Sequence, residues 1–256
     1  MRVLKICKIT IILIFATACS FAAPAGAPPV VDLENAAKKT IVIDAAHGGA
    51  DWGVAASGLY EKDITLKLAK KIKEKILETK NEDIKVLLTR EEDKTMPTAD
   101  RVGLANAAKA QVFISIHCDY DRRETVTGYK IYYYGGKKQS VAPETETMPE
   151  WGNVQKKYPE QNLKFAKMIE KFMKAKLLTE KGIDKGDEKI DEVRLKDRGM
   201  AEANPLSVNG VDMPAVVFET GNLNTKIDSA LLRDDGVLNS VATHIKEALL
   251  NYVLSN

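Results

Sequence analysis

The chain has 256 residues, of which 45% are hydrophobic and 29% are charged, and this ordinary composition excludes collagen-like, coiled-coil and wholly disordered proteins. The formal net charge is only +2, from 38 basic and 36 acidic residues, without a block of like charge that would suit a nucleic-acid-binding arm, so we expect no nucleic-acid partner. Three widely spaced cysteines exclude a disulfide framework and leave stability to packing.

Residues 1–22 are predicted to be a signal peptide. Three basic residues precede the apolar run at residues 9–16, which is too short to span a bilayer as a permanent helix, and small residues follow it. Cleavage after Ala22 is one interpretation. The stretch Ala16-Thr17-Ala18-Cys19 also resembles a lipoprotein cleavage box, in which Cys19 would carry a lipid anchor. We therefore expect export to the periplasm or cell envelope, either in free form or anchored to the membrane through Cys19.

The rest of the chain divides into a spacer and one folded domain. Residues 23–38 are rich in proline and alanine, a composition typical of a semi-extended tether. Residues 39–256 alternate apolar runs typical of strands with amphipathic stretches typical of helices. The predicted strands are residues 40–44, 84–89, 111–117, 128–134 and 214–219, and the predicted helices are residues 63–78, 100–109, 162–178 and 237–254.

The alternation predicts the fold class. The strand at residues 111–117 is apolar on both sides, which is typical of parallel or mixed sheets covered by helices on both faces. We expect a three-layer α/β domain with a central, mostly parallel twisted sheet. Two stretches break the pattern. Residues 135–159 are interpreted as a surface excursion, with a lid over a binding site as the alternative, and residues 179–198 as a solvated connection.

Two of the three histidines directly follow predicted strands. His47 and His117 come at the ends of the strands 40–44 and 111–117, and the carboxyl ends of strands form the binding crevice in open α/β sheets. Glu61 opens the next helix and is either a third metal ligand or an acidic residue that the helix dipole stabilises. His244 lies within the last predicted helix, and we interpret it as part of the helix surface.

Histidine, glutamate and histidine suit a catalytic zinc site. They offer nitrogen and oxygen donors and leave a fourth coordination position for water. Glu219 ends the apolar strand 214–219, where an unpaired carboxylate is costly to bury, so we expect it to be functional. Cys118 follows His117, but neighbouring side chains on a strand point to opposite faces, so we do not expect its thiol in the site.

Three separated motifs carry a resemblance to a known family. The stretches HGGADWGVAASGLYEKD, LLTREEDKTMPTADRVGLANAAKAQVFISIH and PAVVFETGNLNT resemble, in order, the motifs of the zinc-dependent N-acetylmuramoyl-L-alanine amidases with a bacterial amidase type 3 catalytic domain. The resemblance runs from Thr40 to Tyr252. It implies that residues 39–256 are an amidase catalytic domain. It further implies that His47, Glu61 and His117 bind Zn²⁺ and that Glu219 is the catalytic glutamate.

The family resemblance also implies an activity. Such an enzyme is a peptidoglycan hydrolase that cleaves the amide bond between N-acetylmuramic acid and L-alanine with a zinc-activated water, and its partner is the peptidoglycan substrate. The departures from the family pattern, such as Ala45-Ala46 in place of Pro-Gly, bear on the shape of the substrate groove. Arg90, Arg101 and Asn106 match family positions that we interpret as structural. Two alternatives stay open: a catalytically silent peptidoglycan-binding lipoprotein, and a zinc peptidase that acts within the stem peptide.

Overall fold

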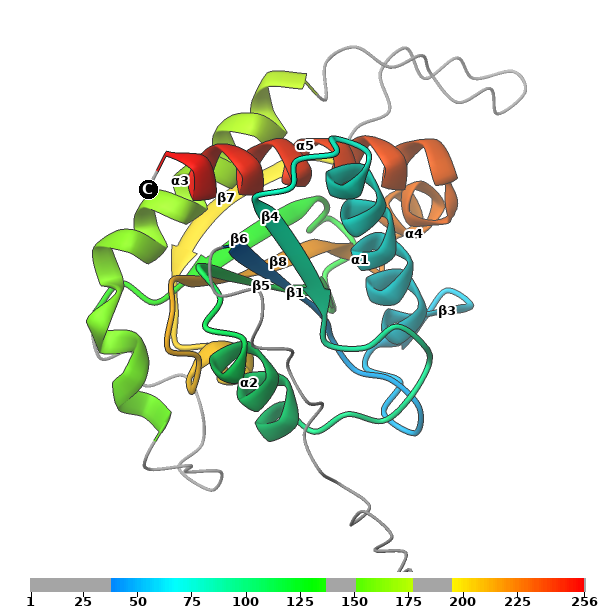
Figure 1. Cartoon of the computed structure of the whole chain (residues 1–256). Helices are drawn as coiled ribbons and strands as arrows, with labels where there is room; N and C mark the ends of the chain where they lie inside the picture. Colours follow the sequence, from blue (N-terminus) through cyan, green and yellow to red (C-terminus); the bar gives the residue numbers. More distant parts are fainter. Residues whose placement is uncertain (1–37, 137–150, 177–194, 256) are drawn as a thin grey trace, which may run out of the picture.

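The computed structural model describes residues 38–136, 151–176 and 195–255 (Figure 1). The predicted signal peptide and tether lie outside the described residues, and so does the alternative lipid anchor at Cys19. Most of the stretches 135–159 and 179–198 also lies outside them, so their interpretation as an excursion or lid and as a solvated connection stays a prediction.

A six-stranded sheet forms the centre of the fold. Its order is β4 (Ile84–Leu88), β1 (Lys39–Ala45), β5 (Val112–Asp119), β8 (Ala215–Asn222), β6 (Tyr129–Tyr133) and β7 (Asp197–Glu202). The first four strands run parallel, β6 is antiparallel to β8, and β7 is parallel to β6. This confirms the predicted mostly parallel sheet.

Helices cover both faces of the sheet (Figure 1). One face packs against α1 (Glu61–Leu77), α3 (Pro159–Lys176) and α5 (Asp235–Leu254), and α4 (Lys226–Arg233) lies between β8 and α5. The other face packs against α2 (Thr98–Ala107) and the 3₁₀ helix η4 (Leu206–Val208). A short hairpin of β2 (Ala55–Ala56) and β3 (Leu59–Tyr60) precedes α1, and a second 3₁₀ helix, η3 (Trp151–Lys157), precedes α3.

The two layers of core follow from the alternation of side chains along each strand. In β1, Ile41 and Ile43 join the larger core, under α1, α3 and α5, whereas Val42 joins the smaller core under α2. In β5, Ile114 enters the larger core and Phe113 enters the smaller one. Strands with both faces buried carry apolar side chains on both faces, which is the pattern that predicted them.

The sequence prediction was wrong about His244. This side chain is buried in α5, with only 4% of its surface exposed, rather than on the helix surface. Val241 and Ala248 are also buried, and they precede and follow His244 by three and four positions, which on a helix places all three on one face. The prediction also missed β7, α4 and the β2–β3 hairpin.

A buried ion pair holds the carboxyl end of β1. The Asp44 carboxylate accepts hydrogen bonds from Arg101 Nη1 (2.7 Å), Thr89 Oγ1 (2.7 Å) and Ser115 Oγ (2.6 Å). Burial alone would raise the pKa of Asp44, but the Arg101 charge and these hydrogen bonds hold it below its ordinary value. The Asp44–Arg101 pair is therefore a buried salt bridge that joins β1 to α2.

We predict that Asp44→Ala destabilises the fold strongly, because it leaves the Arg101 guanidinium buried without its counter-charge. The free energy of unfolding should fall by about 3–5 kcal/mol, as measured by urea denaturation. Asp235 is a matched control, since it pairs with Lys67 on the surface, and Asp235→Ala should cost less than about 1 kcal/mol. Equal losses in the two variants would contradict a special role for the buried pair.

Candidate metal centre

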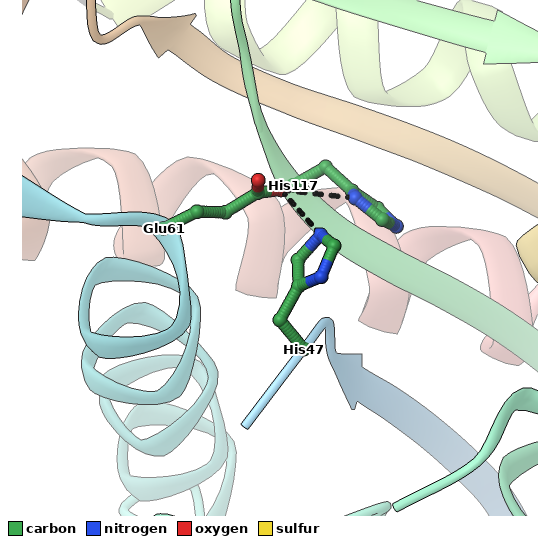
Figure 2. Close-up of side chains that lie close together, drawn as sticks. All are labelled: His47, Glu61 and His117. Atoms are coloured by element: carbon green, nitrogen blue, oxygen red, sulfur yellow. Dashed lines mark hydrogen bonds and ion pairs between the residues drawn. The ribbon is translucent and has the colours of Figure 1, made fainter. Parts of the chain in front are cut away.

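The structure brings His47, Glu61 and His117 together from three separate elements (Figure 2). His47 lies in the loop after β1, Glu61 is the first residue of α1, and His117 lies near the carboxyl end of β5. Because β1 and β5 are adjacent and parallel, both histidines reach the same edge of the sheet. The convergence that the sequence predicted is therefore present.

One carboxylate oxygen lies at the centre of the cluster. Oε1 of Glu61 lies 3.2 Å from Nε2 of His47 and 3.0 Å from Nδ1 of His117, as the dashed lines in Figure 2 show. The two imidazole rings are nearly perpendicular, with their centroids 5.4 Å apart. One ligand atom from each of the three residues lies within 4.8 Å of the others, which is close enough for a single ion to contact all three.

Backbone groups fix the Glu61 carboxylate in place. Oε2 accepts a hydrogen bond from the backbone N–H of Val54 (2.9 Å), and Oε1 accepts one from the backbone N–H of Cys118 (3.0 Å). Burial alone would raise the pKa of Glu61, but its hydrogen bonds to His117 and His47 hold that pKa far below its ordinary value. Glu61 is therefore ionised, and its negative charge favours a cation between the rings.

His47 is held at both its backbone and its ring. Its backbone adopts a left-handed conformation with φ of 60°, and its carbonyl oxygen accepts a hydrogen bond from Arg101 Nη2 (2.6 Å). Nδ1 of the ring lies 2.8 Å from Oδ2 of Asp51, which leaves Nε2 directed at Glu61. Burial alone would lower the pKa of His47, but the hydrogen bonds to Glu61 and Asp51 raise it to about 9.

Asp51 is the residue that the sequence analysis missed. A carboxylate on the far nitrogen of a metal-binding histidine fixes the ring orientation and makes the ring a better ligand. The signal for it in the sequence is an acidic residue four positions after His47, inside a loop rich in glycine. Such a spacing has no regular secondary structure to give it meaning, so only the folded loop reveals the contact.

Glu219 lies beside the cluster on the neighbouring strand. It pairs in register with His117 across β5 and β8. Its Oε2 atom is buried and has no hydrogen-bond partner among the described residues, and the same is true of Nε2 of His117. Burial, together with the nearby negative charge of Glu61, raises the pKa of Glu219 to about 7. His117 and Glu219 thus each hold one buried polar atom with unused hydrogen-bonding capacity on adjacent strands.

A cavity of about 200 Å³ adjoins the two histidines. It lies between the loop that carries His47 and the segment that leads into α2, and its lining includes the hydroxyl-bearing residues Thr95, Thr98 and Ser207. A small polar group that entered this cavity would therefore contact His47 and His117.

Cys118 points away from the cluster, as predicted. Its side chain is buried among Ile64, Leu223 and Leu232, and burial raises the pKa of its thiol well above the ordinary value.

The contacts of Arg90 and Asn106 support the structural interpretation of these two residues. Arg90 donates to the carbonyls of Ala45 and Ala46 at the end of β1 and to that of Lys62 in the first turn of α1. Asn106 bonds the backbone of the segment after η4.

The donor set fits a zinc ion better than it fits a hard cation. Two imidazoles and one carboxylate are ligands that zinc prefers, whereas calcium and magnesium sites use oxygen ligands. The unsatisfied buried nitrogen of His117 and the converging atoms around Oε1 are consistent with a place for a divalent ion.

Among the described residues, no helix combines the length and the apolar character that crossing a bilayer requires.

Comparisons with known proteins show which family the chain resembles over most of its length. The model of the N-acetylmuramoyl-L-alanine amidase family matches residues 41–251. The endolysin of Bacillus phage SPP1 is 33% identical over 204 residues, which cover 80% of this chain and 62% of the endolysin. The N-acetylmuramoyl-L-alanine amidase CwlM of Bacillus licheniformis is 28% identical over 202 residues, which cover 79% of this chain and 64% of that protein. The chain thus spans somewhat less than two thirds of either relative.

A solved structure shows the same fold. The catalytic domain of CwlV, an N-acetylmuramoyl-L-alanine amidase from Bacillus (Paenibacillus) polymyxa var. colistinus, aligns with a TM-score of 0.64 at 27% sequence identity. The alignment covers 85% of this chain and 99% of that domain. The similarity therefore extends over nearly the whole of that catalytic domain.

We predict that Asp51→Ala weakens zinc binding by about 10- to 100-fold, because the His47 ring loses the carboxylate that orients it. Calorimetric titration of the metal-free protein with zinc measures the change. Glu92 is an exposed acidic residue on the neighbouring loop, and Glu92→Ala should leave the affinity unchanged. An unchanged affinity in Asp51→Ala would show that the contact does not orient a ligand.

Proposed function

Because the chain belongs to the N-acetylmuramoyl-L-alanine amidase family, we propose that it is a peptidoglycan hydrolase that cleaves the amide bond between N-acetylmuramic acid and L-alanine. The observation that carries this proposal is the convergence of His47, Glu61 and His117 on one point at the carboxyl edge of the sheet. A resemblance in sequence alone would not require these three side chains to meet.

His47, Glu61 and His117 would hold the zinc ion. When bound, zinc supplies Lewis acidity and lowers the pKa of water to about 7, which makes hydroxide available at neutral pH. Asp51 orients the His47 ring, and the backbone N–H groups of Val54 and Cys118 hold the Glu61 carboxylate. The chain therefore contributes a rigid set of three ligands that does not have to reorganise during the reaction.

Glu219 is the proposed general base and acid. Its buried Oε2 takes a proton from the attacking water, the oxygen of that water adds to the amide carbonyl carbon, and the carbon–nitrogen bond breaks. The same carboxyl group returns the proton to the departing amine of L-alanine. A pKa raised to about 7 suits both directions of proton transfer near neutral pH.

The family acts on the cell wall, so its members work at the cell envelope or outside the cell. We propose that this chain reaches its substrate by export, through the predicted signal peptide at residues 1–22, and that residues 23–38 act as a tether. A lipid at Cys19 would keep the domain at the membrane. Mass spectrometry of the mature amino terminus distinguishes acylated Cys19 from cleavage after Ala22.

Product analysis tests the proposed reaction. Purified sacculi digested with the zinc-loaded protein should release peptides that begin with L-alanine and leave free lactyl carboxyl groups on the glycan. Cleavage between amino acids of the stem would instead identify a peptidase. Intact sacculi with bound protein would identify a catalytically silent binder.

We predict that Glu219→Gln keeps zinc but loses turnover by about 10²- to 10⁴-fold, because an amide side chain cannot accept and return the proton. Zinc content by atomic absorption and the rate of peptide release give the two readouts. A loss of zinc equal to that of a ligand variant would show that Glu219 is a ligand rather than a base.

We predict that His117→Ala loses both zinc and activity, because two ligands then remain for the ion. Circular dichroism checks that the variant is folded, and Glu219→Gln serves as the comparison. Retained zinc in a folded His117→Ala protein would contradict the assignment of His117 as a ligand.

A further inference from the structure

The strongly exposed aromatic side chains among the described residues lie in the chain segments that also carry the candidate zinc ligands. Among the described residues, three aromatic side chains are strongly exposed: Trp52 (53%), Tyr60 (41%) and Tyr120 (51%). Trp52 follows His47 by five positions, Tyr60 directly precedes Glu61, and Tyr120 follows His117 by three positions. Exposed aromatic surface confined to the margin of a site indicates a contact with a ligand.

We propose that Trp52 and Tyr60 form an aromatic platform that binds a sugar ring of the glycan strand. The proposal rests on the proposed function, because it assigns one half of that substrate to one side of the centre. It adds a specificity-determining surface to the zinc ligands and the general base.

Contact between the two rings makes the platform rigid. The centroids of Trp52 and Tyr60 are 5.1 Å apart, and the ring planes are inclined by 64°, in an edge-to-face arrangement. Aromatic pairs in this geometry stabilise one another by about 0.5–1.5 kcal/mol beyond the area that they bury. The pair therefore keeps a defined shape although more than two fifths of each residue is exposed.

The loop ties this platform to the zinc ligands. The backbone oxygen of Trp52 accepts a hydrogen bond from the backbone N–H of Lys62 (3.3 Å), and Tyr60 immediately precedes the first turn of α1. Gly53 packs against two of the three candidate zinc ligands, because a Cβ atom there would come within 2.5 Å of Glu61 Oε2 and 2.6 Å of His47 Cδ2. A sugar ring bound on Trp52 would therefore lie one residue along the chain from Gly53, whose backbone packs against Glu61 and His47.

The chemistry of the two sides assigns the sugar to the platform. Pyranose rings present uncharged faces of C–H groups that pack on aromatic rings, whereas a stem peptide carries carboxylates and amides. The cavity beside the two histidines is lined by charged and hydroxyl-bearing side chains, which suit the polar groups of a peptide, and neither Trp52 nor Tyr60 lines it.

Tryptophan fluorescence tests the proposal directly. The chain has two tryptophans, Trp52 and Trp151, so in a Trp151→Phe background Trp52 is the only tryptophan reporter. Peptide-free glycan strands should change its emission, and free stem peptide should not. Tyr60→Ala in this background should weaken glycan binding by about fivefold to tenfold. A response to stem peptide alone, or to neither probe, would overturn the assignment.

Kinetics on sacculi give a second readout. Trp52→Ala should raise KM by about tenfold and change kcat by less than about twofold, because the platform binds ground state and transition state alike. Trp52→Phe keeps a flat ring and should restore most of the affinity. Leu77→Ala removes a similarly exposed apolar side chain at the last residue of α1 and should have no effect.

The two readouts separate this inference from the proposed reaction. Glycan strands bind without any amide bond to cleave, so a fluorescence response in a protein that releases no L-alanine-headed peptide would refute only the reaction. Amidase activity that is unchanged in Trp52→Ala, with no glycan response, would refute only the platform.

Discussion

The buried contact between Asp44 and Arg101 is the constraint on which the candidate centre depends. The Arg101 guanidinium bonds the Asp44 carboxylate and also the carbonyl oxygens of Ala45 and His47, which follow in the chain. Ala45 is the last residue of β1, and His47 lies in the loop that follows it. Together with Arg90, which bonds the carbonyl oxygens of Ala45 and Ala46, this side chain from α2 satisfies the carbonyls of the turn and supports the left-handed conformation of His47.

The second requirement is a carboxylate that stays ionised although it is buried. Glu61 stands in the first turn of α1, where the helix dipole favours negative charge, and backbone N–H groups from two other segments bond both of its oxygens. The sheet places His47 and His117 on either side of it. The three ligand positions therefore depend on the strand order, on where α1 begins and on the conformation of the loop after β1. The exposed rings of Trp52 and Tyr60 lie in that loop and in the β2–β3 hairpin that follows it.

Most of the architecture could be read from the sequence because its central strands carry apolar side chains on both faces, as residues 112–114 and 116 do in β5, and its helices carry regular apolar stripes. The convergence of His47, Glu61 and His117 was foreseeable because all three follow strands or open helices. β7 escaped prediction because its six residues, Asp197–Glu202, are all only half-buried and include three charged side chains. Asp51 and His244 escaped it because their environments are set by a folded loop and by neighbouring helices.

The burial of Cys118 has a consequence for life outside the cytoplasm. Export through the predicted signal peptide would bring the chain into an oxidising compartment, where an accessible unpaired thiol would form mixed disulfides with other proteins. The apolar residues around Cys118 and its disfavoured thiolate make that sulfur unreactive. The domain can therefore carry a cysteine next to a proposed zinc ligand without needing a covalent partner for it or chaperones to keep it reduced.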